Sequence, residues 1–281
     1  MPTPEQPNDK CTRIALGIEY DGAAYSGWQK QKSPQQETVQ QYIESALSKI
    51  ADQEIVVTCA GRTDSGVHAT CQVVHFDSEV DRGRKAWTEG VNSLLPKSIR
   101  VRWSREQDLD FHARFSALSR RYLYLVYCRD TESAMLHGKV THNRRELNAD
   151  AMHEAAQHLL GERDFSSFRA AGCQSKTAMR NVMHANIYRQ GSFLIFDVKA
   201  NAFLQHMVRN MMGSLMQVGR GEKDPAWIAE LLSLMNRTLA AQTAPPDGLY
   251  LVGVDYPESC GLVTMTSALP DLLMAGMEPW S

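Results

Sequence analysis

The stretch Gly61-Arg62-Thr63-Asp64-Ser65-Gly66-Val67-His68 stands between two segments that read as strands, residues 54–59 and 69–77. Its glycines allow the backbone to turn tightly and to approach a ligand closely. An acid, a base and a hydroxyl fall within this short turn. The pattern leaves two interpretations open: a functional loop built around Asp64, or a hairpin connection in which Asp64 only bonds the neighbouring backbone.

The elements around this stretch follow the order strand, helix, strand, strand, helix, strand. Residues 13–20 alternate apolar and polar positions, which is the period of a half-buried strand. Thr38 and Gln41 have the spacing of a capping box, and an apolar helical stripe follows them. A second helix at 87–94 and a strand at 99–103 complete the series. This order predicts a ferredoxin-like unit, with helices on one face of an antiparallel sheet.

The rest of the chain repeats this order of elements without repeating the sequence. Strands are predicted at 121–127, 183–188, 193–198 and 248–255, and helices at 152–160, at 204–218 and after Asp224-Pro225. We therefore predict an α+β fold in which two βαββαβ halves lie side by side, each with an antiparallel sheet. The cleft between such halves is where a ligand site is most often found.

The predicted boundaries divide the chain of 281 residues into four parts. A flexible tail covers residues 1–12, an N-terminal half carrying Asp64 covers 13–110, a C-terminal half completing the cleft covers 111–260, and a C-terminal tail covers 261–281. Two units of this size agree with the usual length of one hydrophobic core.

The composition points to a globular protein of the cytoplasm. A hydrophobic content of 43% and a charged content of 22% exclude a disordered chain. The first ten residues contain three prolines and no apolar stretch, so they are neither a signal peptide nor a membrane helix. Six cysteines without a C-x-x-C pair argue against a zinc ribbon or a disulfide scaffold. We expect reduced, mostly buried thiols and no contact with membranes.

The charge distribution is uneven. The net charge of −2 is unusual for a nucleic-acid binder, because neutralising phosphates requires Lys and Arg. Residues 97–145 nevertheless contain eleven Lys and Arg against five Asp and Glu, a local charge of +6. This segment is either a basic face that holds RNA or an ordinary solvated surface, and charge alone does not decide between them.

Six stretches in a fixed order resemble one known family. They are Tyr20-Asp21-Gly22, Gly27-Trp28-Gln29, Ala60-Gly61-Arg62-Thr63-Asp64-Ser65-Gly66-Val67-His68-Ala69, Ser119-Arg120-Arg121-Tyr122-Leu123-Tyr124, Asp164-Phe165-Ser166-Ser167-Phe168 and Ala200-Asn201-Ala202-Phe203-Leu204-Gln205-His206-Met207-Val208-Arg209-Asn210. Together they resemble the bacterial tRNA pseudouridine synthase A (TruA) family over residues 13 to about 256. Ser65 departs mildly from the pattern, because the family often has Ala there.

The resemblance implies the pseudouridine synthase fold, which agrees with the doubled element order. It also implies an isomerase that converts uridine to pseudouridine at positions 38, 39 and 40 of the tRNA anticodon stem-loop. Members of the family are homodimers in which one tRNA contacts both subunits. Since isomerisation oxidises nothing and transfers no group to or from another molecule, we expect no cofactor and no metal.

The same resemblance assigns roles to four residues. Asp64 falls on the catalytic aspartate, Tyr122 on the tyrosine that stacks against the target base, and Arg209 on the basic partner of the aspartate. Arg62 matches a residue that fills the space left by the flipped base. Without the resemblance, the pattern alone favours an exposed helix arginine at Arg209 and a core aromatic of a strand at Tyr122.

The chemistry leaves several alternatives open. An ionised Asp64 can attack C1′ of the ribose, or it can remove the 2′ proton to give a glycal. Competing functions are an RNA-binding module without catalysis and a phosphotransfer enzyme with Asp64 as nucleophile, although the chain shows no carboxylate motif for Mg²⁺. The nine histidines have no metal-ligand spacing and are interpreted as structural, surface or RNA-facing.

Overall fold

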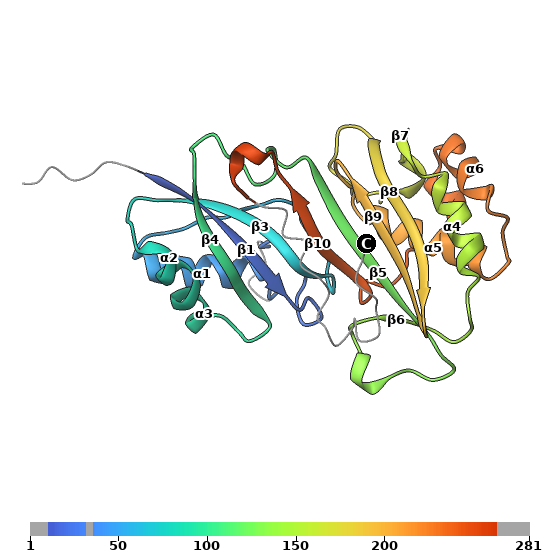
Figure 1. Cartoon of the computed structure of the whole chain (residues 1–281), viewed down its shortest axis with the longest axis horizontal. Coiled ribbons are helices and arrows are strands. Elements are labelled where there is room, and N and C mark those ends of the chain that lie inside the picture. Colours follow the sequence, from blue (N-terminus) through green and yellow to red (C-terminus); the bar gives the residue numbers. More distant parts are fainter. Residues whose placement is uncertain (1–10, 32–35, 263–281) are drawn as a thin grey trace, which may run out of the picture.

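One mixed sheet of ten strands runs through the molecule (Figure 1). The computed structural model describes residues 11–31 and 36–262, so most of the two predicted tails lies outside the described residues. The strand order is β4-β1-β3-β10-β5-β9-β8-β7, with β2 paired to β3 and β6 paired to β5.

The N-terminal half has the predicted order of elements. Its elements are β1 (Thr12–Tyr20), α1 (Val39–Ala51), β2 (Thr58–Cys59), β3 (His68–Ser78), α2 (Gly83–Lys85), the π-helical turn η1 (Ala86–Gly90), α3 (Val91–Leu94) and β4 (Ile99–Gln107). The strands pair in the order β4-β1-β3-β2. This is the pairing of a ferredoxin-like unit.

The C-terminal half uses the same pairing with additional short elements. Its elements are β5 (Ser119–Cys128), η2 (Ala134–Leu136), β6 (Thr141–Asn143), α4 (Ala149–Gln157), β7 (Gly161–Asp164), η3 (Ser166–Phe168), β8 (Met179–Gln190), β9 (Phe193–Ala200), α5 (Met207–Gly219), α6 (Trp227–Leu234), η4 (Arg237–Leu239), β10 (Leu249–Asp255) and η5 (Glu258–Cys260). If the four main strands of each half are numbered from one in chain order, both halves have the spatial order 4-1-3-2. This order is β4-β1-β3-β2 in the first half and β10-β5-β9-β8 in the second. The doubled pattern is thereby confirmed.

Strand β10 makes the two sheets continuous, which the sequence did not predict. Leu251 pairs in parallel with Ala69 of β3 and antiparallel with Tyr122 of β5. Figure 1 shows β10 between the strands of the two halves. It occupies the edge of β3 at His68 and Ala69, while β2 pairs further along the same strand. The two halves are therefore joined by backbone hydrogen bonds as well as by side chains.

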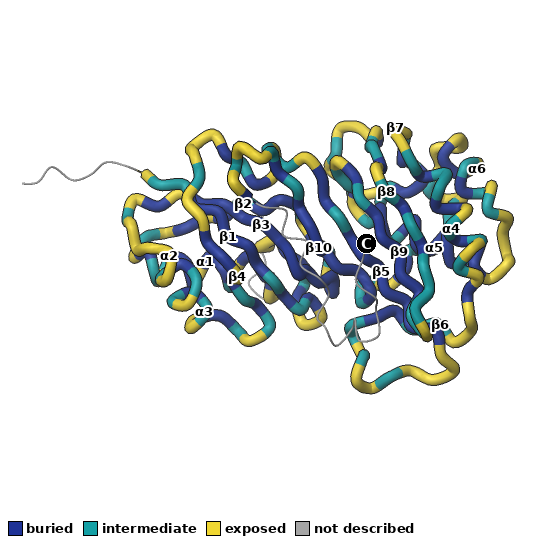
Figure 2. The backbone as a smooth tube through the Cα atoms, viewed as in Figure 1, coloured by how far each residue is buried: buried dark blue, intermediate teal, exposed yellow. Residues whose placement is uncertain are grey.

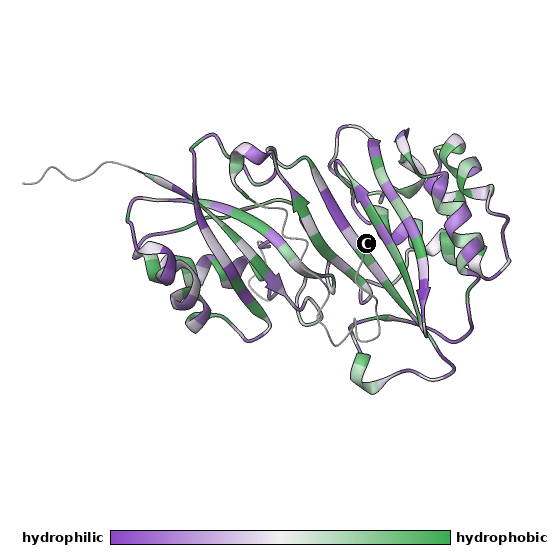
Figure 3. Ribbon diagram, in the orientation of Figure 1, coloured by the Kyte–Doolittle hydropathy of each residue, from purple (hydrophilic) through white to green (hydrophobic). Residues whose placement is uncertain are grey.

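The main hydrophobic core lies between the sheet and its helices (Figure 2). Alternate residues of β5 divide between the two faces of the sheet: Tyr122, Tyr124 and Val126 belong to this core, whereas Leu123 and Leu125 belong to a smaller cluster. Figure 3 shows that hydrophobic and hydrophilic residues follow one another along the strands. Within the described ranges, no helix has the length and apolar character needed to span a bilayer.

Helix α1 begins at the predicted place but without the predicted capping box. The Thr38 side chain makes no cap hydrogen bond, and its buried hydroxyl has no hydrogen-bond partner among the described residues. The backbone N–H groups of Val39 and Gln40 instead donate to the carbonyl oxygens of Gly27 and Trp28, at 3.2 and 3.0 Å. Carbonyls from a distant loop therefore satisfy donors at the start of the helix that a local side chain was expected to satisfy.

Strand β2 is shorter than the predicted strand at 54–59. The N–H of Ile55 donates to the Ser48 hydroxyl at 2.9 Å, and that of Val57 donates to the Glu44 carboxylate at 3.1 Å. These donors bond side chains of α1 and are not part of a strand ladder. Only Thr58 and Cys59 pair with β3.

The cysteines match the expectation of reduced thiols, because all six are free. Cys59, Cys71 and Cys128 are buried, while Cys173 and Cys260 are partly exposed. Cys11 is exposed, so burial applies to half of the thiols and not to most of them.

Candidate active site

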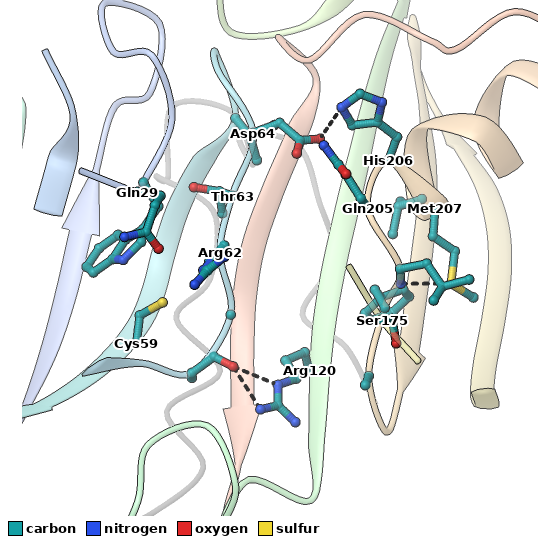
Figure 4. Close-up of a pocket in the computed structure, with 18 of the residues that line it drawn as sticks. Gln29, Cys59, Arg62, Thr63, Asp64, Arg120, Ser175, Gln205, His206 and Met207 are labelled. Atoms are coloured by element: carbon teal, nitrogen blue, oxygen red, sulfur yellow. Dashed lines mark hydrogen bonds and ion pairs between the residues drawn. The ribbon is translucent and has the colours of Figure 1, made fainter. Parts of the chain in front are cut away.

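A cavity of about 790 Å³ lies between the two halves on the helix-bearing face of the sheet. The N-terminal half contributes residues 57–64, and the C-terminal half contributes residues 172–175 and 202–208. Arg120 and Tyr122 of β5 lie between these two walls. Figure 4 shows side chains of both walls directed into the same space, with Asp64 facing His206. The predicted cleft is therefore present, and Asp64 lines it.

The carboxylate of Asp64 lies close to two cationic or potentially cationic side chains. Its Oδ2 atom is 3.3 Å from an Nη atom of Arg209 and 3.6 Å from Nε2 of His206. His206 immediately precedes α5, and Arg209 lies in the first turn of that helix. The start of a helix also carries a partial positive charge. Asp64 thus lies beside a permanent cation and close to the start of a helix, and 26% of its side chain is exposed.

Arg209 approaches Asp64 from outside the cavity lining. Its Nε donates to the carbonyl oxygen of Ala244 at 2.8 Å, and the N–H of Ala244 donates back to the Arg209 carbonyl at 3.1 Å. Only 14% of the side chain is exposed. The alternative interpretation of Arg209 as an exposed helix arginine is therefore wrong, and the guanidinium is fixed in position beside the carboxylate.

His206 was not predicted as a site residue from the sequence. It is one of three residues other than glycine with a positive φ within the described ranges, at +60°. That conformation is unfavourable for most side chains and is concentrated at functional sites. It places the imidazole on the cavity side of Asp64. The available signal was its position three residues before Arg209 in the same motif.

Tyr122 lies on the floor of the cavity with 7% of its surface exposed. Its ring packs edge to face against Phe203, with centroids 5.1 Å apart and an interplanar angle of 83°. Burial is the main cause that raises the pKa of the Tyr122 hydroxyl, and the charge of Asp64 adds to this effect while Arg120 opposes it. The phenol is therefore neutral at physiological pH and can donate a hydrogen bond.

Three hydrogen bonds hold the loop that carries Asp64. The Tyr20 hydroxyl lies 2.8 Å from that of Thr63, and the N–H of Trp28 donates to the Thr63 carbonyl at 3.0 Å. The Gln72 amide donates to the carbonyl oxygen of Gly61 at 2.6 Å. Partners on β1, β3 and the loop after β1 thus surround the residues that precede Asp64.

Two glycines let the loop after β1 reach the Asp64 loop. A Cβ atom on Gly22 would lie 2.0 Å from the Val67 carbonyl oxygen. A Cβ atom on Gly27 would lie 2.8 Å from the Thr63 carbonyl oxygen, and φ is +88° at this residue. Side chains at these positions would therefore push the two loops apart. This accounts physically for the glycines in two of the quoted motifs.

Arg62 and Arg120 both line the cavity but differ in burial and in hydrogen bonding (Figure 4). Arg62 is exposed, and its guanidinium has no hydrogen bond or ion pair with any residue of the described ranges. Arg120 is buried and donates to the carbonyl oxygen of Ala60 at 2.8 Å and to that of Asn201 at 2.9 Å. Arg62 is free to contact a ligand, whereas Arg120, which the sequence analysis also missed, connects the two cavity walls.

Metal ligands do not cluster in the described part of the chain. No group of three or more His, Cys, Asp or Glu there has the arrangement needed to hold a metal ion. Among the described residues that line the cavity, Asp64 is the only carboxylate, and four arginines line the same cavity: Arg62, Arg114, Arg120 and Arg180. Such a lining suits an anionic ligand.

Comparisons with known proteins agree on one family. The family model described as tRNA pseudouridine synthase matches residues 17–116 and 155–257. A tRNA pseudouridine synthase A of Enterobacter sp. (strain 638) is 56% identical over 246 residues, which cover 88% of this chain and 90% of that protein. A tRNA pseudouridine synthase A of Vibrio cholerae (strain O395) is 54% identical over 264 residues, covering 93% and 99%.

Among solved structures, the archaeal box H/ACA sRNP Nop10-Cbf5 complex contains a chain that is similar over 84% of this chain and 47% of its own length. The sequence identity is 13% and the TM-score is 0.32. The assignment to a family therefore depends on the sequence comparisons.

Proposed function

Because the chain belongs to the tRNA pseudouridine synthase family, we propose that it converts uridine to pseudouridine at positions 38, 39 and 40 of the tRNA anticodon stem-loop. The contact of Asp64 with Arg209, at the edge of a cavity formed by both halves, is the observation that carries this proposal. The enzyme is an isomerase, and the reaction takes up no oxidant, reductant or donor group.

The reaction exchanges one glycosidic bond for another. The bond from N1 of uracil to C1′ breaks, the base turns within the site, C5 bonds to C1′, and the C5 proton is lost while N1 gains one. Asp64 acts as the ionised carboxylate, either by attacking C1′ or by removing the 2′ proton. Arg209 and the start of α5 stabilise that charge.

Tyr122 provides the surface against which the target base lies. Its ring belongs to the cavity floor, and its neutral hydroxyl can take part in removal of the C5 proton through a hydrogen bond. A uridine in a stem must leave its stack to reach this site, which costs a few kcal/mol. Arg62, exposed and without a protein partner among the described residues, would fill the space that the base leaves.

The halves at 13–110 and 111–260 would act as one unit, because β10 from the second half completes the sheet of the first. We further propose that the enzyme works in the cytoplasm, where its tRNA substrate is found, as a homodimer in which each tRNA contacts both subunits. Sedimentation with and without tRNA tests the dimer, since one tRNA bound per pair of chains is expected.

The decisive experiment uses tRNA that carries tritium at C5 of uridine. Purified protein should release tritium without added cofactor, and Asp64→Asn should abolish release while tRNA binding persists. Asp130→Asn, a change at an exposed carboxylate outside the cavity, should behave as wild type. Release by the Asp64→Asn protein at the wild-type rate would reject the proposed function.

A further inference from the structure

A rigid turn between the two halves, residues 112–116, exposes a phenyl ring beside the cavity. Phe115 is 77% exposed, although large aromatic side chains are normally buried when they serve only the fold. Its neighbour Arg114 lines the cavity that contains Asp64. The residue next to the exposed ring in sequence, Arg114, therefore forms part of the cavity wall.

The turn is held by its own hydrogen bonds. Nδ1 of His112 accepts the backbone N–H groups of Arg114 and Phe115, each at 3.2 Å. The N–H of His112 donates to the Ser116 hydroxyl at 2.9 Å, and the N–H of Ser116 donates to the His112 carbonyl at 2.8 Å. The imidazole also stacks on Phe115, with centroids 4.3 Å apart. The ring is thus presented in a defined orientation.

The turn is also anchored to the body of the protein. Nδ1 of His75 on β3 accepts the N–H of Ala113 at 3.1 Å, and the Tyr256 hydroxyl donates to the Ala113 carbonyl at 2.6 Å. The guanidinium of Arg120 donates to the Arg114 carbonyl at 2.5 Å. Three buried side chains therefore fix an exposed aromatic tip. A ring that is ordered before a ligand arrives loses little entropy on binding it.

Arg114 completes the arrangement. Its guanidinium lies 5.7 Å from the centre of the Phe115 ring, near the outer limit of a cation–π contact. It has no hydrogen bond or ion pair with the residues that the structure describes. The guanidinium can therefore turn towards a phosphate without breaking a protein contact. An aromatic platform beside a free arginine is the combination that binds single nucleotides of RNA.

Building on the proposed function, we propose that Phe115 stacks on the base of one nucleotide near the target uridine, while Arg114 binds a phosphate of the same strand. This subsite positions RNA and takes no part in bond making. The cavity is larger than one nucleoside requires, so the polynucleotide on either side of the target can enter its rim. The competing possibility is that a second copy of this chain packs against the exposed ring.

The first test measures the dissociation constant of transcribed tRNA at one fixed salt concentration, because affinity for RNA depends strongly on salt. Phe115→Ala should raise the constant about tenfold, since stacking on one base contributes about 1–3 kcal/mol. Phe115→Trp should restore tight binding. Leu109→Ala removes another exposed apolar side chain from the same connection, 60% exposed, and should bind as wild type.

The second test locates the stacked base. Abasic substitutions, one at a time, across the anticodon stem-loop should reveal one position at which the effect of Phe115→Ala disappears. Arg114→Gln should lower the slope of log affinity against log salt by about one, because one phosphate contact is lost, and Phe115→Ala should leave that slope unchanged. At saturating tRNA, Phe115→Ala should form pseudouridine at the wild-type rate. That result would show that the ring positions RNA and takes no part in the chemistry.

Three results would overturn the subsite. Normal tRNA affinity of Phe115→Ala would exclude stacking, and a weakened affinity that no abasic position relieves would exclude a base as the partner. Loss of dimerisation in Phe115→Ala would identify a second copy as the occupant. Each of these outcomes can occur while wild-type protein still forms pseudouridine, so they are distinct from failure of the proposed function, in which wild-type protein is itself inactive.

Discussion

Asp64 shares its surroundings with a guanidinium and an imidazole, which both lie near its Oδ2 atom. Arg209 is nearly enclosed and is fixed by Ala244, whereas His206 lines the cavity. Arg209 therefore provides a constant charge, and His206 lies where it can contact the substrate. Asp64, Tyr122 and Arg62, to which the family resemblance assigns roles, all line the cavity, and those roles stay predictions.

For Arg209 we expect a loss of rate with little loss of binding. Arg209→Gln removes the charge partner of Asp64, and single-turnover rates on tRNA should fall about 100-fold because a partly buried carboxylate is left without its cation. The dissociation constant of tRNA should change less than about threefold, since Arg209 does not line the cavity. Arg209→Lys, which keeps a charge but not the planar geometry, should recover part of the rate.

Equal reductions of rate and binding in Arg209→Gln would instead mean that the substrate itself contacts the guanidinium. The pairing could be predicted only through the family resemblance, because Arg209 and Asp64 are 145 residues apart. His206 escaped prediction because a single residue in the left-handed conformation leaves no periodic signal in the sequence.

At the scale of elements, hydrogen bonds to residues outside a segment took the place of some that local spacing predicts. The capping box at Thr38 and the strand at 54–59 are both favoured by local spacing. In the fold, the donors of α1 bond loop carbonyls, and the donors of residues 55 and 57 bond side chains of α1. Local sequence thus located the helices and most strands, but it could not show which distant groups would satisfy their ends.

Gly27 should be essential to the shape of the Asp64 loop. Gly27→Ala introduces a Cβ atom 2.8 Å from a backbone oxygen at a φ of +88°, so the two loops must separate. We expect the free energy of unfolding to fall by about 2 kcal/mol and activity to fall about tenfold or more. Urea denaturation and tritium release measure the two effects.

Gly191→Ala serves as the matched control for this substitution. Gly191 also has a positive φ, at +54°, but no atom lies within 4 Å of the position its Cβ would take. The free energy of unfolding of Gly191→Ala should fall by only about 1 kcal/mol, the cost of a side chain in the left-handed conformation. The variant should retain full activity. Indistinguishable activities of the two variants would show that the contact between the two loops is not needed for catalysis.

His75 should make the connection between the halves sensitive to acid. Burial, together with the charges of Arg13 and His112, lowers the pKa of His75 from 6.5 to about 4. Its Nδ1 accepts a backbone N–H, and protonation there would break that bond. Since the folded-state pKa lies below that of the unfolded chain, the stabilisation is complete above about pH 6.5 and declines as the pH falls towards 4.

The full contribution of His75 is at most about 3.5 kcal/mol, from about 1.4 kcal/mol for each pKa unit. His75→Asn keeps an acceptor atom near the position of Nδ1 but does not titrate in this range. The free energy of unfolding, measured by urea between pH 5 and pH 7.5, should therefore vary less in the variant than in the wild type. Parallel curves for the two proteins would remove His75 as the cause.

At the scale of the whole molecule, the site exists only because the two halves share a sheet and are connected across the cavity. The sequence predicted two units and a cleft, but it did not predict the continuity through β10. Every pairing of β10 with β3 or β5 joins residues more than a hundred positions apart, and such pairings leave no mark on local periodicity.

Arg120 should be the most sensitive connection between the halves. Arg120→Met would leave the carbonyl oxygens of Ala60, Asn201 and Arg114 without this donor. We expect a loss of about 3 kcal/mol in the free energy of unfolding, because buried acceptors would remain unsatisfied. Arg102→Met removes an arginine whose side chain is 58% exposed, and its effect should stay within about 1 kcal/mol. Equal effects in urea denaturation would contradict this role of Arg120.

Residues 249–255 are made after every other described strand, because β10 is the last strand in chain order. Until they leave the ribosomal exit tunnel, β3 and β5 lack the neighbour that lies between them. The wall that carries the carboxylate and the floor that carries the phenol therefore cannot be assembled before that point. A growing polypeptide would consequently hold no working site until residue 255 has emerged from the ribosome.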